Sequence, residues 1–188
     1  TPDHWHVTMA QLALAAGKKV FCEKPTLTIE EGRRLANDVA ARQAMFAVGL
    51  EDRAVIYYHK LAEAVRNGAI GKLERIKVSL PTKPVFAREE PVKVPDDLDY
   101  EMWLGPAPHR PYTPTLLDPQ VWRQIRDFSG GSLTDWGAHL VDTAQVANFA
   151  ENSSPVAVRG KGVIPPDSVN TVPRTYDITY TYANGVEL

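Results

Sequence analysis

Lys24 is the first residue whose position suggests chemistry. It lies in the stretch FCEKPTLT, residues 21–28, where Glu23 and Lys24 follow a short apolar run and precede Pro25. A lysine held at the end of a buried strand can take part in proton transfer, because its ammonium group is partly removed from water. Pro25 favours a rigid turn just beyond it, which can include a cis peptide bond. The alternative is a solvated surface lysine that pairs with Glu23.

Asp135 and His139 form the second candidate group, in the stretch GGSLTDWGAHLVDTAQ, residues 130–145. On a helix, residues four apart share one face with Cβ atoms about 6 Å apart, so both side chains could serve one substrate. Asp142 continues the same stripe. Two alternatives stay open: a core histidine bonded to Asp135, or a metal site built from Asp135, His139 and Asp142. The metal site would need a further ligand that the sequence does not indicate.

Several histidine and aromatic residues, and one arginine, are further candidates for the site. His4 and His6 in the stretch HWH lie about 200° apart on a helix, so they do not form a chelating pair there. We expect His6 to face the ligand crevice and His4 to be exposed. Trp122 and Arg123, shortly before the Gly-Gly pair, either line a sugar-sized pocket or pack in the core or in a lid.

The elements that must position Lys24 belong to an α/β pattern of helix, strand, helix and strand with short connections. Such a pattern predicts a parallel sheet, whose ligands bind beyond the carboxyl ends of the strands. This rule places Glu23 and Lys24 at the ligand crevice. The predicted elements are a helix over residues 3–17, capped by Asp3 and ended by Gly17, a strand over 18–22, a helix over 28–42 begun by the capping box of Thr28 and Glu31, and a strand over 45–49.

The remainder of the chain changes character. Most of the chain's 15 prolines fall in residues 81–119, which predicts an ordered excursion or lid rather than core. A turn signal at Ala183-Asn184-Gly185 predicts a hairpin whose return strand has only three residues. The other predicted elements are a helix over residues 55–66, a strand over 72–81, a helix over 132–149 and strands over 155–163 and 175–182.

Composition favours a small-molecule partner. The chain has 21 basic and 23 acidic residues and a net charge of −2, so it shows no basic footprint for nucleic acid or a membrane surface. No apolar run reaches the roughly 18 residues of a membrane span. Cys22 is the single cysteine, and neither a Cys/His metal pattern nor a GxGxxG phosphate loop occurs. A cytoplasmic protein is expected, with the periplasm left open.

Taken together, TPDHWH, AGKKVFCEKP and GGSLTDWGAHLVD resemble the Gfo/Idh/MocA family of NAD(P)-dependent oxidoreductases. The resemblance implies an α/β fold, in which the C-terminal part of a Rossmann domain over residues 1–52 is followed by a substrate-binding α+β domain with an open mixed sheet over residues 53–188. It also implies a central fragment that lacks the N-terminal GxGxxG units and the C-terminal strands, and whose activity on its own is left open.

The resemblance further implies roles for individual residues. Lys24 contacts substrate and the nicotinamide of NAD or NADP. In the reaction that this implies, His139 removes the hydroxyl proton, Asp135 orients or charge-stabilises His139, and Lys24 either holds the developing alkoxide or relays the proton. The cofactor site implied is Thr1, Pro2, Asp3, His6, Glu23, Lys24 and Pro25, with Asp3 in place of the commoner Asn, and the implied substrate-binding residues are Trp122, Arg123, Asp135 and His139.

The same resemblance implies the reaction and the partners. The implied substrate is a carbohydrate or polyol, oxidised at a hydroxyl-bearing carbon, and the implied partner is a further copy of the chain, bound through the open sheet. Two rival functions stay open: an NAD-retaining glycoside hydrolase or lyase that oxidises its sugar transiently, and a non-catalytic assembly module.

Overall fold

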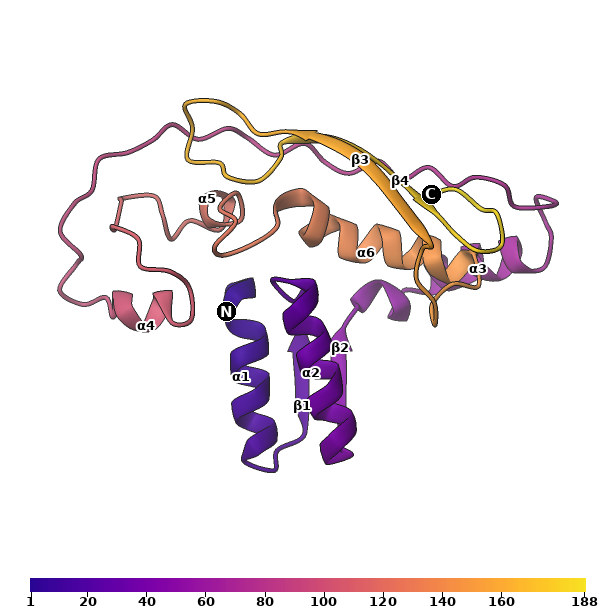
Figure 1. The fold of residues 1–188 in the computed structure, drawn as a ribbon, viewed down its shortest axis with the longest axis horizontal. Coiled ribbons are helices and arrows are strands. Elements are labelled where there is room, and N and C mark those ends of the chain that lie inside the picture. The colour runs from indigo at the N-terminus through magenta and orange to yellow at the C-terminus, as the bar shows by residue number, and fades with distance from the viewer.

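A computed structural model describes all 188 residues of this α/β protein, and its elements lie in layers (Figure 1). An α/β unit formed by residues 1–49 stands below a long helix, and an antiparallel ribbon lies on the other side of that helix. The α/β fold expected from the sequence is confirmed, and its sheets are open and have two strands each.

The lower unit has the predicted order of helix, strand, helix and strand. It consists of α1 (Asp3–Ala15), β1 (Val20–Glu23), α2 (Ile29–Arg42) and β2 (Phe46–Gly49). The two strands pair in parallel along their full length. In Figure 1 the carboxyl ends of both strands point toward the long helix above them. Because ligands of such sheets bind beyond the carboxyl ends of the strands, we expect a ligand site where this unit meets that helix.

The ends of the two helices follow local signals in part. The Thr28 side chain accepts a hydrogen bond from the Glu31 backbone N–H at 3.1 Å, as the capping box predicts. The predicted cap at Asp3 is wrong, because Asp3 is the first residue of α1 and Pro2 precedes it without a side-chain cap. The Asp3 carboxylate instead accepts a 2.6 Å hydrogen bond from Ser129 Oγ. A tertiary partner has replaced the local one.

Apolar burial holds the lower unit together. Side chains from one face of α1 meet α2, and the buried cluster consists of Val7, Ala10, Leu14 and Leu35. Residues seven apart, such as Val7 and Leu14, lie on one helix face, which explains why α1 presents a continuous apolar stripe. The packing fixes α1 beside β1 and so fixes the residues that precede α1.

The long helix is α6 (Gly131–Ala147), and it crosses above the carboxyl ends of β1 and β2 (Figure 1). A short 3₁₀ turn, η1 (Glu51–Ala54), leads from β2 to α3 (Ile56–Arg66), which packs beside α6. Gly131 has φ +67°, and a Cβ atom there would come within 2.7 Å of Val172 Cγ2. The glycine therefore permits the sharp entry into α6.

The ribbon above α6 is formed by β3 (Ala157–Val163) and β4 (Thr175–Thr181), which pair antiparallel. The predicted hairpin turn is present: Gly185 has φ +86°, and the Leu188 N–H donates to the Tyr180 carbonyl at 2.9 Å. Every residue of β3 is exposed. The ribbon is thus an open edge of the molecule.

The predicted strand over residues 72–81 is wrong. This segment runs extended, but it forms one isolated parallel bridge, between Arg75 and Glu187. The Ile76 N–H donates to the Glu187 carbonyl at 2.8 Å. The segment pairs here with the short return segment of the hairpin, around Glu187, and the two form too few backbone hydrogen bonds for a strand.

The expectation that residues 81–119 lie outside the core is also wrong. The segment includes α4 (Tyr100–Leu104) and ends at the start of α5 (Pro119–Trp122). The prolines break the periodicity of its apolar residues, which come together only in three dimensions. The larger of the two buried hydrophobic clusters is formed here and just beyond, by Tyr100, Leu104, Leu116, Trp122, Ile125 and Phe128.

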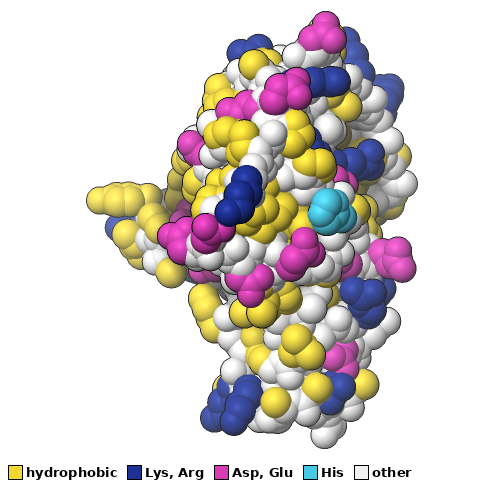
Figure 2. Space-filling view, turned by 90° about the vertical axis from the view of Figure 1, so that its left-hand side faces the viewer, with side chains coloured by type: hydrophobic (Ala, Val, Ile, Leu, Met, Phe, Trp, Pro, Cys, Tyr) yellow, Lys and Arg dark blue, Asp and Glu magenta, His cyan; other side chains and the backbone are white.

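The surface on the α4 side mixes all classes of side chain. Figure 2 shows hydrophobic side chains near the centre of this face, with acidic and basic side chains interspersed around them. This face therefore presents no extended field of one sign. As to membranes, no helix has both the length and the apolar character that a crossing would need.

Candidate active site

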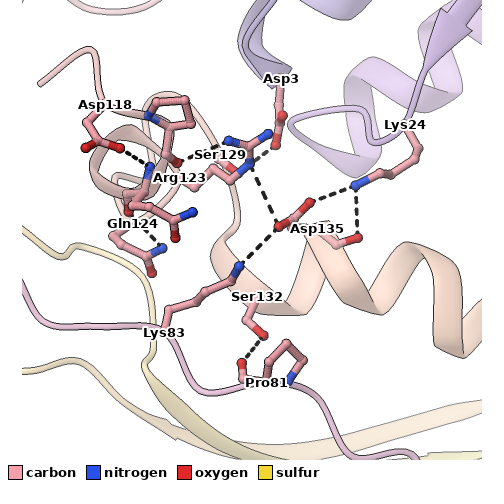
Figure 3. A network of polar contacts seen from close by, with 12 residues as sticks. Asp3, Lys24, Pro81, Lys83, Asp118, Arg123, Gln124, Ser129, Ser132 and Asp135 are labelled. Carbon is pink, nitrogen blue, oxygen red and sulfur yellow. Dashed lines mark hydrogen bonds and ion pairs between the residues drawn. The ribbon is translucent and has the colours of Figure 1, made fainter.

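The candidate site lies between the carboxyl end of β1 and the first turns of α6. Lys24 follows β1 directly, and its Nζ donates to Asp135 Oδ1 at 2.8 Å and to the Asp135 carbonyl at 3.1 Å (Figure 3). The two side chains are 14% and 18% exposed. Lys24 therefore pairs with Asp135, not with Glu23, and is not a solvated surface lysine. The peptide bond before Pro25 is cis, as the turn suggested.

Asp135 is the centre of a larger set of charges. Lys83 Nζ and Arg123 Nε lie 3.6 Å and 3.8 Å from Asp135 Oδ2, in addition to the bond from Lys24 (Figure 3). Burial acts to raise the pKa of Asp135, but the hydrogen bond from Lys24 and the three positive charges outweigh it, so the pKa lies below its usual value. Asp135 is an ionised counter-ion at neutral pH.

The expectation that Asp135 orients His139 is not met. Both residues lie on α6 four positions apart, but Asp135 hydrogen bonds to Lys24, and His139 Nδ1 lies 3.8 Å from Asp52 Oδ2 instead. At that separation the two groups interact electrostatically and do not form a hydrogen bond. Nδ1 is buried and has no hydrogen-bond partner. The alternative of a core histidine bonded to Asp135 is wrong for the same reason.

Asp52 is a site residue that the sequence reasoning missed. It lies in η1, directly beyond the carboxyl end of β2, just as Lys24 lies beyond the end of β1. Applying the same strand-end rule to the second strand would have found it. Lys83, in contrast, lies in the proline-rich segment, where no local pattern marks it.

The metal site considered from Asp135, His139 and Asp142 is not formed. Asp142 is bound by Arg53 through two hydrogen bonds of 2.7 Å, and Asp135 is bound by Lys24. A different set of three ligand atoms, from Glu51, Asp52 and His139, lies within 4.8 Å of one another. This set, not the helical stripe, is where the chain could accommodate a metal ion.

The start of α1 and the turn after β1 are joined by His6. Its Nδ1 lies 2.8 Å from the Pro25 carbonyl oxygen and its Nε2 lies 3.2 Å from that of Thr1. The segments TPDHWH and EKP, far apart in the sequence, thus meet at one edge. The Glu23 carboxylate lies over the end of β2, because a Cβ atom on Gly49 would lie within 2.9 Å of its oxygens.

His4 was expected to be exposed, and this is wrong. It is 2% exposed, and its Nε2 lies 3.0 Å from the Trp103 carbonyl oxygen. The ring meets Trp103 and Phe128 with centroid separations of 5.5 Å and 5.1 Å. Burial lowers the pKa of His4, partly offset by the hydrogen bond to Trp103, which favours a neutral packing residue.

The sequence left open whether Trp122 and Arg123 line a pocket or pack in the core, and the two residues differ in this respect. Trp122 is buried in the larger core cluster, so it is a packing residue. Arg123 lies over the Trp122 ring, with its Cζ atom 4.3 Å from the centroid, and reaches Asp135 as described. The indole therefore acts as a support for the guanidinium group and not as a wall of an open pocket.

Comparison with known proteins agrees with this geometry. Residues 83–188 match the C-terminal alpha/beta domain of an oxidoreductase family, and residues 1–50 match the NAD-binding Rossmann fold of the same family. The chain belongs to the Gfo/Idh/MocA oxidoreductase family. The family resemblance in the three motifs is thereby confirmed, together with a nicotinamide dinucleotide as the family's cofactor.

Several relatives in this family are similar to the chain. Inositol 2-dehydrogenase of Rhizobium meliloti (strain 1021) is 30% identical over 80 residues, which is 42% of this chain and 24% of that protein. The 1,5-anhydro-D-fructose reductase of Ensifer adhaerens is 28% identical over 159 residues, which is 82% of this chain and 37% of that protein. The chain therefore spans well under half of either relative.

A solved structure gives the same fold. The crystal structure of GenD2 from gentamicin A biosynthesis in complex with NAD aligns with a TM-score of 0.70 at 19% sequence identity. The alignment covers 100% of this chain and 44% of that one. At this identity the likeness is one of fold, and it supports the arrangement of the α/β unit below α6.

Proposed function

We propose that this chain provides the catalytic part of a nicotinamide-dependent dehydrogenase that acts on a hydroxyl-bearing carbon of a sugar or polyol. In this proposal residues 1–52 are the C-terminal part of the dinucleotide-binding domain, and residues 53–188 are the substrate domain. The observation that carries it is that two side chains able to act on a substrate hydroxyl, Lys24 and His139, lie beside separate carboxylates. Lys24 lies beside Asp135, and His139 lies beside Asp52. The relatives named for inositol and anhydrofructose support the class of substrate.

The residues expected at the cofactor fit a dinucleotide. A groove along α1 and β1 is lined by Thr1, His6, Cys22 and Glu23 together with apolar residues of both elements, and Glu23 directly precedes Lys24 in the chain. When bound, NAD or NADP supplies the hydride acceptor or donor. The Thr1, His6 and Glu23 side of the groove would hold the nicotinamide end, because these residues converge on the turn that carries Lys24.

The chain's own residues then divide the proton chemistry. His139 removes the proton from the substrate hydroxyl during oxidation, and Asp52, 3.8 Å away, stabilises the imidazolium that results. Lys24 donates a hydrogen bond to the same substrate oxygen and stabilises the negative charge that develops on it. Asp135 holds the Lys24 ammonium in place through the 2.8 Å bond.

The test is substitution in the full-length protein. Lys24→Met and His139→Asn should each lower kcat for polyol oxidation by about 100-fold or more while the circular dichroism spectrum is retained, because each removes a group that acts on the reacting oxygen. Product analysis accompanies the assay: a net dehydrogenase accumulates free reduced nicotinamide. Turnover without reduced nicotinamide, or full activity in the Lys24 variant, would contradict the proposal.

Asp52 is proposed as a positioning residue and needs a separate readout. Asp52→Asn should lower kcat about 10-fold and leave KM nearly unchanged, because the imidazolium that forms at His139 loses its neighbouring negative charge in the transition state. Asp96→Asn is the matched control, since Asp96 is exposed and its partner is the surface residue Lys93. An equal effect on kcat in both variants, or an effect on KM alone, would remove Asp52 from the mechanism.

A further inference from the structure

Three cations converge on the single carboxylate of Asp135. They come from distant parts of the chain: Lys24 follows β1, Lys83 lies in the extended segment beneath the ribbon, and Arg123 follows α5 (Figure 3). Their nitrogen atoms lie 2.8 Å, 3.6 Å and 3.8 Å from the Asp135 oxygens. We call Lys24, Lys83 and Arg123 the cationic cluster.

The cationic cluster carries more positive charge than its nearest carboxylate neutralises. Asp135 is the one carboxylate within 4 Å of these nitrogen atoms, so three cations face one anion at ion-pair distance. The Asp3 carboxylate lies further out, and burial raises its pKa, although its bond to Ser129 opposes the rise. Asp118, which lies near Arg123 in Figure 3, keeps its charge while it caps α5, but it makes no ion pair with the guanidinium group within 4 Å.

This excess charge is kept partly out of water. Lys83 is 15% exposed and Arg123 is 31% exposed. Holding like charges together in such a place is unfavourable unless an anion joins them. Asp135 needs one cation, and Lys24 already provides it with a short hydrogen bond. Lys83 and Arg123 lie beyond hydrogen-bond distance of that carboxylate, so the pairing with Asp135 does not satisfy their donors.

Arg123 and Lys83 are also held in place by other contacts. The Arg123 guanidinium lies over the Trp122 ring at 4.3 Å, and its Nη1 donates to the Pro119 carbonyl at 3.1 Å. Lys83 Nζ lies 5.8 Å from the centre of the Trp136 ring. Ordering of this kind lowers the entropy lost when the groups bind a ligand.

We propose that the substrate bears an anionic group, a carboxylate or a phosphate, which Lys83 and Arg123 bind while Lys24 and His139 act on the hydroxyl. The inference rests on the proposed function, since it names the substrate class of the same site. A guanidinium matches the two oxygens of a carboxylate or phosphate, and a lysine adds a point charge beside it. A sugar acid or a sugar phosphate therefore fits the site better than a neutral polyol.

The experiment uses the full-length protein with NAD and with NADP. Matched neutral and anionic substrates are compared: D-glucitol with D-gluconate for the carboxylate, and D-glucose with D-glucose 6-phosphate for the phosphate. We expect kcat/KM to favour an anionic member by at least about 10-fold, because a charge-assisted contact is formed with that member alone. The two pairs distinguish a carboxylate from a phosphate.

Substitution of Lys83 tests the residue. Lys83→Met should lower kcat/KM for the preferred anionic substrate by about 10-fold to 100-fold and remove most of the preference for that substrate over its neutral partner. Lys83→Arg should retain most of the activity because it keeps the charge. Lys93→Met is the control, since Lys93 is a surface residue that is 81% exposed. Binding of D-gluconate and inorganic phosphate, measured by calorimetry, should weaken in Lys83→Met alone.

The outcomes separate this inference from the proposed function. Equal kcat/KM for the neutral and anionic members of both pairs, with no change in Lys83→Met, overturns the anionic substrate and leaves the dehydrogenase standing. Anion binding that is lost in Lys83→Met, without any hydride transfer to the panel, supports the anion site and counts against the dehydrogenase. Absence of both binding and turnover overturns the two together.

Discussion

Gly105 provides a sharp test of how the lower unit is fixed to the rest of the molecule. It ends α4 with φ +48° and ψ −116°, and a Cβ atom there would overlap the indole ring of Trp5 in α1. Trp5 Nε1 donates to the Met102 and Trp103 carbonyls at 3.2 Å and 3.1 Å. Gly105→Ala therefore has to displace the contact that joins α1 to the α4 segment.

The expected loss of stability is the sum of three effects. The backbone conformation, with φ +48° and ψ −116°, costs an alanine about 1–3 kcal/mol. Overpacking against the indole costs about 1–3 kcal/mol. Weakening the shared hydrogen bond of Trp5 costs about 1 kcal/mol. We expect Gly105→Ala to lower the free energy of unfolding by about 3–7 kcal/mol, relative to the unsubstituted chain.

Gly68→Ala is the matched control. Gly68 has φ +79°, but no atom lies within 4 Å of the position a Cβ would take. Gly68→Ala should lower the free energy of unfolding only by the backbone cost of about 1 kcal/mol. Alanine also reduces the entropy of the unfolded chain, but this effect is common to both variants. Urea unfolding of both variants with equal m values measures the difference. Equal losses, within about 0.5 kcal/mol, would refute the argued overlap with Trp5.

Two further predictions concern charge and capping. Asp135→Asn should lower the free energy of unfolding by about 2 kcal/mol at neutral pH, because it leaves three part-buried cations without their carboxylate. Since the folded pKa of Asp135 lies below 3.8, this difference is full above that value and is lost as the pH falls through the lower folded value; a difference in Tm that persists at about pH 2 would contradict it. Thr28→Ala should lower the stability by about 1 kcal/mol, measured in urea against Thr28→Ser, which keeps the cap; equal stabilities would show that the Thr28 cap contributes nothing.

The lower unit was largely predictable because its signals are local. Glycine after α1, the capping box at Thr28 and short apolar strands determine helix, strand, helix and strand over 1–49, and this order in turn predicts parallel pairing. Residues 81–119 gave no such signal. Their core residues, such as Tyr100 and Leu116, are separated by prolines, so their burial depends on tertiary contacts that periodicity does not describe.

The sequence predicted some members of the site, Lys24, Arg123, Asp135 and His139, but it did not predict Asp52 and Lys83 or which side chains pair. Helical spacing shows that Asp135 and His139 are on one face, but it does not show which neighbour each side chain selects. The stronger partner of Asp135 is Lys24, which is 111 residues away, and the neighbour of His139 is Asp52 in η1. His4 illustrates the same limit, because a polar residue near a chain end became a buried contact of Trp103.

This exchange of partners bears on which group removes the proton. Lys24 already donates to the Asp135 carboxylate at 2.8 Å, and an ammonium group can donate to an oxygen but cannot accept a proton. The buried Nδ1 of His139 has no hydrogen-bond partner and faces Asp52 at 3.8 Å, which suits an N–H at Nδ1 and leaves the lone pair on Nε2. A base must have a free lone pair, whereas an electrostatic stabiliser must keep its charge. Within the proposed function, the separate carboxylates therefore favour His139 as the base and Lys24 as the group that stabilises the negative oxygen.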